Sequence, residues 1–498
     1  MSFKAGASKV DITPDWPVYL AGYGSRTAKH ESVLAPIYAR ALALEAADGT
    51  RAVQLSLEII GVSNEIVAEL QEALAPYGVQ PAAVRLTCTH THSAPSISNV
   101  YCGCLGGSAV DGLGQGWANL HPSPCSTTRA QGYIDIAAYE AWLVPRVIRA
   151  ATTALAALAL TTLEYGNTRC EVAVNRRNNN EGEIERLAAA GKLDKASLLG
   201  PVDHDVELLV ARAANGLPTA VLFGYACHAT VLGEQSLHGD WPGHAMAQLE
   251  RQHPGLIAMH INGCSGDTNP LPRRKEEYRT QYGDEMATAV STALRSPSLV
   301  AIPADAALRC VAVELPLRYH TLPTEAELIR TRDDDQYFAP CMLPTGCSGD
   351  GATVSKLARV PSNAASDPNS GSWSSSSMVK FDYSPFYAKE WASAMLAKGV
   401  ENLPQYQPQP YPVSLWTLGS VVTWISLGGE VTLGYVARLR HELGCRAWVS
   451  AYTNQCQGYR LREYTIACMP ACLPVSDRPS VCPSVCMSLS VCSVYLSV

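Results

Sequence analysis

The chain has 498 residues, enough to bury a substantial hydrophobic core and, at roughly 150 residues per domain, to form about three domains. Hydrophobic residues make up 47% of it and charged residues 17%, which excludes a disordered chain and a fibrous one. The 38 Lys and Arg against 45 Asp and Glu give a net charge of −7, and no block of like charge is present, which argues against a nucleic-acid-binding protein and a polybasic membrane-surface protein.

The N-terminal segment, MSFKAGASKVDITP, has a single lysine, no apolar stretch and an early proline, unlike a signal peptide or a membrane anchor. The most apolar stretch, residues 150–163, is rich in Ala and Leu but too short to cross a bilayer, so we expect a packed core helix there. The sequence therefore predicts no transmembrane segment and, by default, a cytoplasmic protein.

Apolar runs typical of strands alternate along the chain with helical patterns. The strand-like runs are residues 38–44, 52–57, 84–88, 206–211, 220–226, 256–261, 421–427 and 445–450. The helix-like patterns are residues 65–74, 137–160, 243–251, 285–294 and 432–443. This order predicts an α/β or mixed α+β fold, in which β-sheets are flanked by helices.

Two segments depart from this alternation. Residues 341–378 are rich in Ser, Gly, Asn and Pro, which predicts an inserted loop without chemistry. Residues 461–498 hold five of the 17 cysteines in a degenerate Ser-Val-Cys repeat, namely Cys468, Cys472, Cys482, Cys486 and Cys492. Their spacing differs from that of zinc modules, and we interpret 461–498 as a low-complexity, disordered or artefactual tail. Residues 1–460 are then expected to form one catalytic unit, without a disulfide framework.

The unusual polar clusters follow strand-like runs directly. They are THTHSAPS (89–96), CHAT (227–230), NGCSGDTNP (262–270), GGE (428–430) and AYTNQCQGY (451–459). Ligands of α/β proteins gather at the carboxyl ends of strands, where loops converge. We therefore expect these five distant segments to build one pocket, with a metal site at the carboxyl ends of the strands.

His90 and His92 form an H-x-H pair. On extended backbone, residues i and i+2 point to the same face, so both imidazoles can address one centre. Neutral imidazole is the commonest metal ligand, although two core or surface histidines explain the pair equally well. His228 lies among Tyr225, Ala226 and Cys227, where a buried ionisable group needs either a hydrogen bond or a metal.

Glu430 stands between two glycines and a helical pattern. A carboxylate at a helix N-terminus is favoured as a structural cap, yet the glycines also let the backbone approach a ligand closely. Two His and one Glu are a set that catalytic zinc sites use, with one position left open to water or substrate. The sequence is compatible with either interpretation, and His/Glu sets accept other first-row ions as well.

Further polar residues lie near these clusters. Arg176 and Arg177 form a basic pair whose usual place is the solvated surface, although an arginine fork can clamp a substrate oxygen. Asp240 and Asp267 can either cap helices or orient metal-ligating side chains by hydrogen-bonding to them. For both aspartates we favour capping.

In order along residues 5–460, these segments resemble the N-terminal catalytic domain of the neutral/alkaline non-lysosomal ceramidase family. The motifs that carry the resemblance are KVDITP (9–14), LAGYGSR (20–26), PIYARALALE (36–45), THTHSAP, VNR, VDHDVELL (202–209), FGYACHATVLG, GDWPGHA, GCSGDTNP, GGE and AYTN. Each motif is short, and the combination in a fixed order makes chance a poor explanation.

The resemblance implies a zinc ion held by His90, His228, Glu430 and Tyr459. It also implies that His92 and Arg176 contact the substrate or the transition state, and that the reaction hydrolyses the N-acyl amide bond of ceramide to sphingosine and fatty acid. Zinc chemistry agrees with this, because zinc lowers the pKa of bound water and polarises a carbonyl. His92 is then expected to shuttle a proton or to donate to the oxyanion.

The chain departs from the family in two places. Asn269 occupies the position of a serine in the ceramidase motif G-x-x-S-P, and an asparagine can hydrogen-bond but cannot act as a nucleophile. A catalytic role for Asn269 therefore fits a metal-water mechanism better than an acyl-enzyme one. No run of strands follows Tyr459, where ceramidases carry an immunoglobulin-like domain.

The sequence thus predicts a zinc-dependent amidohydrolase of a small-molecule or lipid N-acyl amide, with a place in sphingolipid metabolism if that amide is ceramide. One alternative is a metal-dependent hydrolase of a small polar amide or ester. The other is a non-catalytic or truncated, inactive family member. An apolar groove leading to His90 would favour the lipid substrate, because acyl tails need a large buried apolar area.

Overall fold

The computed structural model describes residues 2–23, 26, 28–97, 126–316, 323–334, 392–393, 395–397, 399–402, 410–444, 446–456 and 459–460. The predicted inserted loop, 341–378, and the predicted tail, 461–498, lie outside the described residues. Within the described part of the chain, no helix combines the length and the apolar character needed to cross a membrane.

Three larger sheets form the framework. The first has the order β5 (Val79–Cys88), β4 (Arg51–Leu57), β3 (Tyr38–Glu45), β1 (Lys4–Asp11) and β6 (Ala159–Leu160). The second has the order β12 (Ile257–Asn262), β10 (Pro218–Tyr225), β9 (Asp205–Arg212), β7 (Thr162–Arg169) and β14 (Val300–Ala301). The third has the order β15 (Leu308–Leu315), β16 (Tyr411–Leu418), β17 (Val422–Leu427) and β19 (Trp448–Ser450).

Each larger sheet is antiparallel except for one parallel pair at an edge. These parallel pairs are β4–β5, β10–β12 and β17–β19. Three two-stranded pairs complete the description: β2 (Ser32–Val33) with β11 (Ser236–Leu237), β8 (Ala173–Asn175) with β13 (Thr268–Pro270), and β18 (Glu430–Val431) with β20 (Tyr459–Arg460). The last two pairs lie in segments that the sequence analysis marked as functional.

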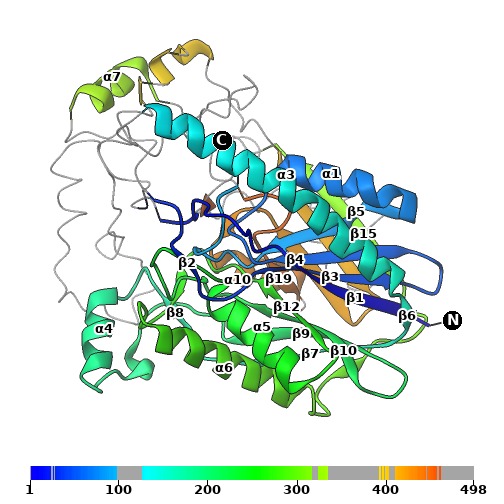
Figure 1. Ribbon diagram of the computed structural model, residues 1–498. Helices are drawn as coiled ribbons and strands as arrows, with labels where there is room; N and C mark the ends of the chain where they lie inside the picture. The colour runs from blue at the N-terminus through cyan, green and yellow to red at the C-terminus, as the bar shows by residue number, and fades with distance from the viewer. Residues whose placement is uncertain are drawn as a thin grey trace.

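Helices cover the outer faces of the first two sheets (Figure 1). Helices α1 (Asn64–Leu74) and α3 (Ser126–Ala156) lie on the first sheet, and α5 (Asp240–Gln252) and α6 (Glu276–Ala293) lie on the second. The remaining helices are α4 (Glu181–Ala189), α7 (Glu325–Asp333) and α10 (Gly434–Leu443). The predicted mixed α/β architecture, with helices flanking sheets, is confirmed.

The second sheet shows why its strands lack an alternation of apolar and polar residues. In β9, Leu208 and Val210 pack on the side of α5 and α6, whereas Leu209 and Ala211 belong to the core shared with the first and third sheets. Successive strand residues point to opposite faces. Because both faces are covered, residues 208–211 are all apolar, and the strand loses the alternation seen in sheets with one solvent-exposed face.

The structure corrects the bounds of two predicted helices. The predicted helix 137–160 begins at Ser126 and ends at Ala156, and Ala159–Leu160 instead form β6, which pairs with the edge of β1. The predicted helix 285–294 begins at Glu276, nine residues earlier. The predicted elements lack strands β1, β7, β15 and β16 and helices α4 and α7, although β1 lies between β3 and β6 in the first sheet.

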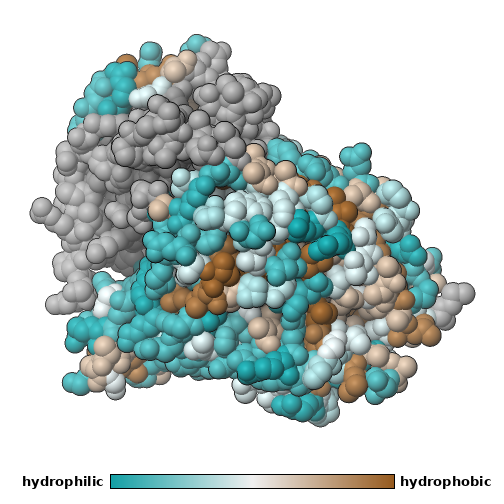
Figure 2. All heavy atoms as spheres, in the orientation of Figure 1, coloured by the Kyte–Doolittle hydropathy of each residue, from teal (hydrophilic) through white to brown (hydrophobic). Residues whose placement is uncertain are grey.

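The surface seen in Figure 2 is mainly hydrophilic, with hydrophobic groups of limited size between polar ones. The exposed large hydrophobic side chains of the described residues are Val33, Leu34, Tyr77, Leu160, Leu199, Leu217, Val300 and Ile329. Most of them are separated along the chain, as is usual for folded proteins, in which single exposed apolar residues are common.

A buried ion-pair cluster joins the first sheet to helix α5. Arg40 of β3 donates from Nη1 to the carboxylate of Glu58 and from Nε to Oε1 of Glu250 at 3.3 Å. The side chains of Arg40 and Glu58 are each 1% exposed, so neither charge is solvated by water. Such a cluster is destabilising when only one partner is removed, because the other charge stays buried without compensation.

We expect Arg40→Met to lower the free energy of unfolding by about 3–5 kcal/mol. The double substitution Arg40→Met/Glu58→Met should recover a large part of that loss, because no uncompensated carboxylate then remains at position 58. Urea denaturation of both variants measures the difference, with Arg309→Met, at an exposed position of β15, as the control. A double variant at least as unstable as the single one would contradict this account.

Candidate metal centre

Strands of all three sheets deliver the central side chains. His90 follows β5, His228 follows β10 and Glu430 follows β17, each within three residues of the strand end. His90 and His228 are 0% exposed and Glu430 is 2% exposed. The expectation that functional segments converge at the carboxyl ends of strands is confirmed for these three residues.

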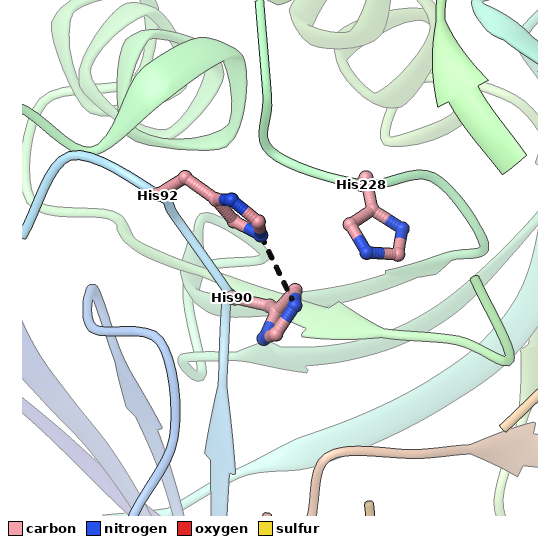
Figure 3. A group of neighbouring side chains, drawn as sticks. All are labelled: His90, His92 and His228. Carbon is pink, nitrogen blue, oxygen red and sulfur yellow. Dashed lines mark hydrogen bonds between the residues drawn. The ribbon is translucent and has the colours of Figure 1, made fainter. Parts of the chain in front are cut away.

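The imidazole rings of His90, His92 and His228 converge (Figure 3). Nε2 of His90 lies 3.4 Å from Oε1 of Glu430, and Nε2 of His228 lies 3.3 Å from Oε2 of the same carboxylate. Nε2 of His92 lies 3.3 Å from Nε2 of His90. One ligand atom from each of the three histidines falls within 4.8 Å of the others.

Backbone carbonyls fix the tautomers of two histidines. Nδ1 of His90 donates to the carbonyl of Ile60 at 2.6 Å, and Nδ1 of His228 donates to the carbonyl of Ser265 at 2.6 Å. A carbonyl can only accept, so Nδ1 carries the proton and Nε2 of the neutral ring presents a lone pair. This outer-shell arrangement is the one that metal-ligating histidines adopt.

Two buried acceptors consequently face each other. Nε2 of His228 and Oε2 of Glu430 have no hydrogen-bond partner among the described residues, and both present lone pairs across 3.3 Å. Leaving buried polar atoms unpaired costs about 1–3 kcal/mol each. A cation between them removes that cost, and this donor set is one that zinc and related first-row ions use.

The separations leave room for a metal ion between the carboxylate and the imidazoles. Zinc–nitrogen and zinc–oxygen bonds of about 2.0–2.1 Å place neighbouring ligand atoms about 3.3–3.4 Å apart. Oε1 of Glu430 lies 3.4 Å from Nε2 of His90, and Oε2, the other oxygen of the carboxylate, lies 3.3 Å from Nε2 of His228. The donor set of His90, His228 and Glu430 therefore suits zinc and related first-row ions.

The electrostatic setting keeps His92 and His228 neutral and Glu430 charged. Burial, and next the positive charge of Arg176, lower the pKa of His228 to about 3. Burial, followed by His90 and His228, holds the pKa of His92 well below its usual range. Burial raises the pKa of the Glu430 carboxyl while His90 and His228 lower it, and the net shift is well below its usual range. Metal ligands need these protonation states.

Arg176 and Asn269 form a second group next to the centre. Strands β8 and β13 pair so that Asn269 lies opposite Val174. Nη1 of Arg176 donates to Oδ1 of Asn269 at 3.3 Å, and Nη2 donates to the carbonyl of Gly266 at 2.7 Å. Arg176 is therefore anchored in the fold rather than free at the surface, and its charge acts on both His92 and His228.

Tyr459, the fourth predicted ligand, is placed by its backbone alone. Its Cα pairs with that of Glu430 in the parallel ladder of β18 and β20, so the sheet brings the two positions together. The position of its side chain lies outside the description, and its assignment as a ligand stays a prediction.

Two expectations about local geometry are wrong. His90 has a φ of 62°, so the H-x-H segment is not extended; the histidines meet because the chain turns after β5. Glu430 is not at a helix N-terminus, since it forms part of β18 and α10 begins at Gly434. Oδ1 of Asp267 accepts from the Leu433 amide before α10, at 3.0 Å, so Asp267 takes the capping role.

Sequence reasoning missed three contributors. Tyr452 places its ring 4.4 Å from that of His90 and accepts a hydrogen bond from Oγ of Ser265 at 2.8 Å. Its position in the segment AYTN and its φ of 54° mark it as unusual, and only the motif was visible in the sequence. The other two are the carbonyls of Ile60 and Ser265. Every residue has a backbone carbonyl, so the amino-acid sequence does not distinguish these two from the rest.

No protein-family model matches the sequence, and no curated protein matches it. Solved structures do match, among them two of ceramidases. One is described as a ceramidase complexed with C2, with a TM-score of 0.58 and 16% sequence identity. The match covers 99% of this chain and 74% of the ceramidase chain. The other is a neutral ceramidase from Pseudomonas aeruginosa, with a TM-score of 0.57 and 17% sequence identity. That match covers 99% of this chain and 75% of the ceramidase chain. This chain has the neutral ceramidase fold.

The expected resemblance to neutral ceramidases is thereby confirmed at the level of the fold. At these identities the likeness concerns the path of the backbone. What the site can do is decided by the side chains of this chain, which the neutral ceramidase fold brings to the ends of its strands.

Replacing Glu430 by glutamine tests the metal centre. In metal-free protein, the amide N–H₂ can donate to Nε2 of His228, so we expect Glu430→Gln to raise the melting temperature above that of metal-free wild type. Zinc at about 100 times its Kd should stabilise the wild type by about 2.7 kcal/mol and the variant far less. Scanning calorimetry with and without zinc measures both effects.

Glu314→Gln is the matched control, because it removes an exposed carboxylate on β15 and should change neither response. A zinc-induced rise in Glu430→Gln equal to that of wild type would show that the ion binds elsewhere.

Proposed function

We propose that the protein is a zinc-dependent amidohydrolase that cleaves an N-acyl amide bond. The observation that carries the proposal is the buried convergence of His90, His228 and Glu430, where Nε2 of His228 and Oε2 of Glu430 have no hydrogen-bond partner among the described residues. The neutral ceramidase fold supports it, because two ceramidase structures share this architecture. Ceramide, cleaved to sphingosine and fatty acid, is the first substrate to test.

His90, His228, Glu430 and Tyr459 are the proposed zinc ligands. When bound, zinc supplies a Lewis acid for the amide carbonyl and lowers the pKa of water towards about 7. The chain supplies buried ligands of fixed orientation. The His90 and His228 side chains are 0% exposed, and their rings are held by hydrogen bonds to the Ile60 and Ser265 carbonyls.

His92, Arg176 and Asn269 are the proposed catalytic residues. His92 is neutral and has Nε2 next to the centre, so it can take the proton of an attacking water and pass it to the leaving nitrogen. Arg176 offers N–H groups to the oxygen that gains charge. Asn269 accepts from Arg176 and so orients it. Asparagine has no nucleophilic oxygen, which favours attack by water over an acyl-enzyme.

A substrate panel tests the reaction. Fatty acid release is measured with ceramide, with N-acyl amides that have smaller headgroups, with short polar amides and with the matching esters. We expect amide cleavage by the zinc-loaded protein, a loss of activity in Glu430→Gln, and a drop in kcat of about 100-fold in Arg176→Lys, because a lysine cannot reproduce the guanidinium fork.

Arg186→Lys, on the exposed face of α4 and paired with Glu183, is the control and should retain wild-type turnover. Turnover that survives Glu430→Gln would refute the assigned centre. Cleavage of short polar substrates alone would keep the metal hydrolase and exclude a lipid substrate.

A further inference from the structure

His92 is held differently from the two histidines beside it. The Nδ1 atoms of His90 and His228 each donate to a carbonyl, whereas the buried Nδ1 of His92 has no hydrogen-bond partner in the part of the chain that the structure describes. The side chain is partly buried, and its ring lies 5.0 Å from that of His90. Apart from the contact of its Nε2 with Nε2 of His90 at 3.3 Å, the orientation of His92 comes from its backbone and from the groups packed against the ring.

Arg26 holds the backbone of His92. Its Nη1 donates to the carbonyls of His92 and Ala21, and its Nη2 donates to the carbonyl of Glu234 at 2.8 Å. The guanidinium thus ties together three segments that are distant in sequence. Burial lowers the pKa of Arg26 to about 10, so the group stays charged at neutral pH, and charge-assisted hydrogen bonds of this kind are about twice as strong as neutral ones.

Tyr23 and Gly22 pack on the imidazole itself. The ring of Tyr23 meets that of His92 edge-on, with 5.0 Å between centroids, and the Arg26 guanidinium lies 4.8 Å from the Tyr23 ring. Gly22 has a φ of 96°, and a Cβ at that position would lie 2.4 Å from Cγ of His92. Only glycine allows this close approach to the His92 ring.

We infer that Arg26 is the positioning residue for His92. It acts in two ways: directly on the His92 carbonyl, and through Tyr23 on the His92 ring. Lysine cannot replace it, because one ammonium group lacks the planar fork that reaches three carbonyls and lies on the aromatic ring. The role that His92 plays in catalysis rests on the proposed function, whereas its placement by Arg26 does not.

Histidine-selective ¹⁵N NMR on the metal-free protein tests the placement without any reaction. The His92 ring signals are identified by their loss in His92→Gln. We expect Arg26→Gln and Arg26→Lys to shift or broaden these signals, while remote histidines such as His253 keep theirs. Arg146→Gln is the matched control, because Arg146 also donates to a carbonyl and lies on an aromatic ring, both of Trp142 on α3.

His92 signals at their wild-type positions in Arg26→Gln would overturn the inference, and so would an equal shift in Arg146→Gln. If Arg26→Gln does not fold, as judged by the remote histidine signals, Arg26→Lys decides, because it keeps the charge and most of the volume.

Kinetics add a second readout if the wild type cleaves a panel amide. Arg26→Gln should lower kcat at least tenfold with KM and zinc content unchanged. In a His92→Ala background it should cause no further loss, because residues that act through one another are not additive. Additive losses would overturn the inference. A wild type that cleaves no amide would refute the proposed function alone, and the NMR experiment would still decide the role of Arg26.

Discussion

The centre of this protein is a pair of hydrogen-bond acceptors, Nε2 of His228 and Oε2 of Glu430, held 3.3 Å apart on two buried side chains. Two lone pairs at this distance repel unless a cation lies between them. The protein must therefore hold both side chains against that repulsion in the absence of an ion. A backbone carbonyl accepts a hydrogen bond from Nδ1 of His90 and another from Nδ1 of His228. In addition, His90, His228 and Glu430 each follow a strand of a different sheet.

Backbone bridges close the three sheets around the centre. An isolated bridge links Thr91, after the first sheet, to Ala229, after the second. Another links Gly263 of the second to Ser450 of the third, and Thr87 of the first pairs with Thr453 beyond the third. Every pair of sheets is thus joined by main-chain hydrogen bonds next to the site. Displacing one ligand requires breaking such bridges, which explains how strained positions such as His90 and Tyr452 persist.

The sequence predicted those strands whose pattern of apolar residues matches the burial of their faces in the structure. Strands β9, β10 and β12 are rich in apolar residues on both faces because both faces are covered. Strand β1 was not predicted, because its sequence KAGASKVD holds small and polar residues. The reason is tertiary: α3 crosses β1 so closely that a Cβ on Gly6 would lie 2.2 Å from the Ala154 carbonyl, and Ser8 donates to the Ala150 carbonyl. A pattern of single residues does not reveal such an approach.

The candidate site was predicted where side-chain type carries the chemistry, as for His90, His228 and Glu430, and missed where the backbone does. The Ile60 and Ser265 carbonyls illustrate this limit, and they also separate the histidines by role. A metal ligand needs one fixed tautomer, and a carbonyl on Nδ1 provides it. A proton shuttle must exchange the proton between states, and a carbonyl on Nδ1 would lock it. His92 is held by packing and by Arg26, and no such carbonyl contacts its Nδ1 among the described residues, which is the condition that the proposed role of proton shuttle requires.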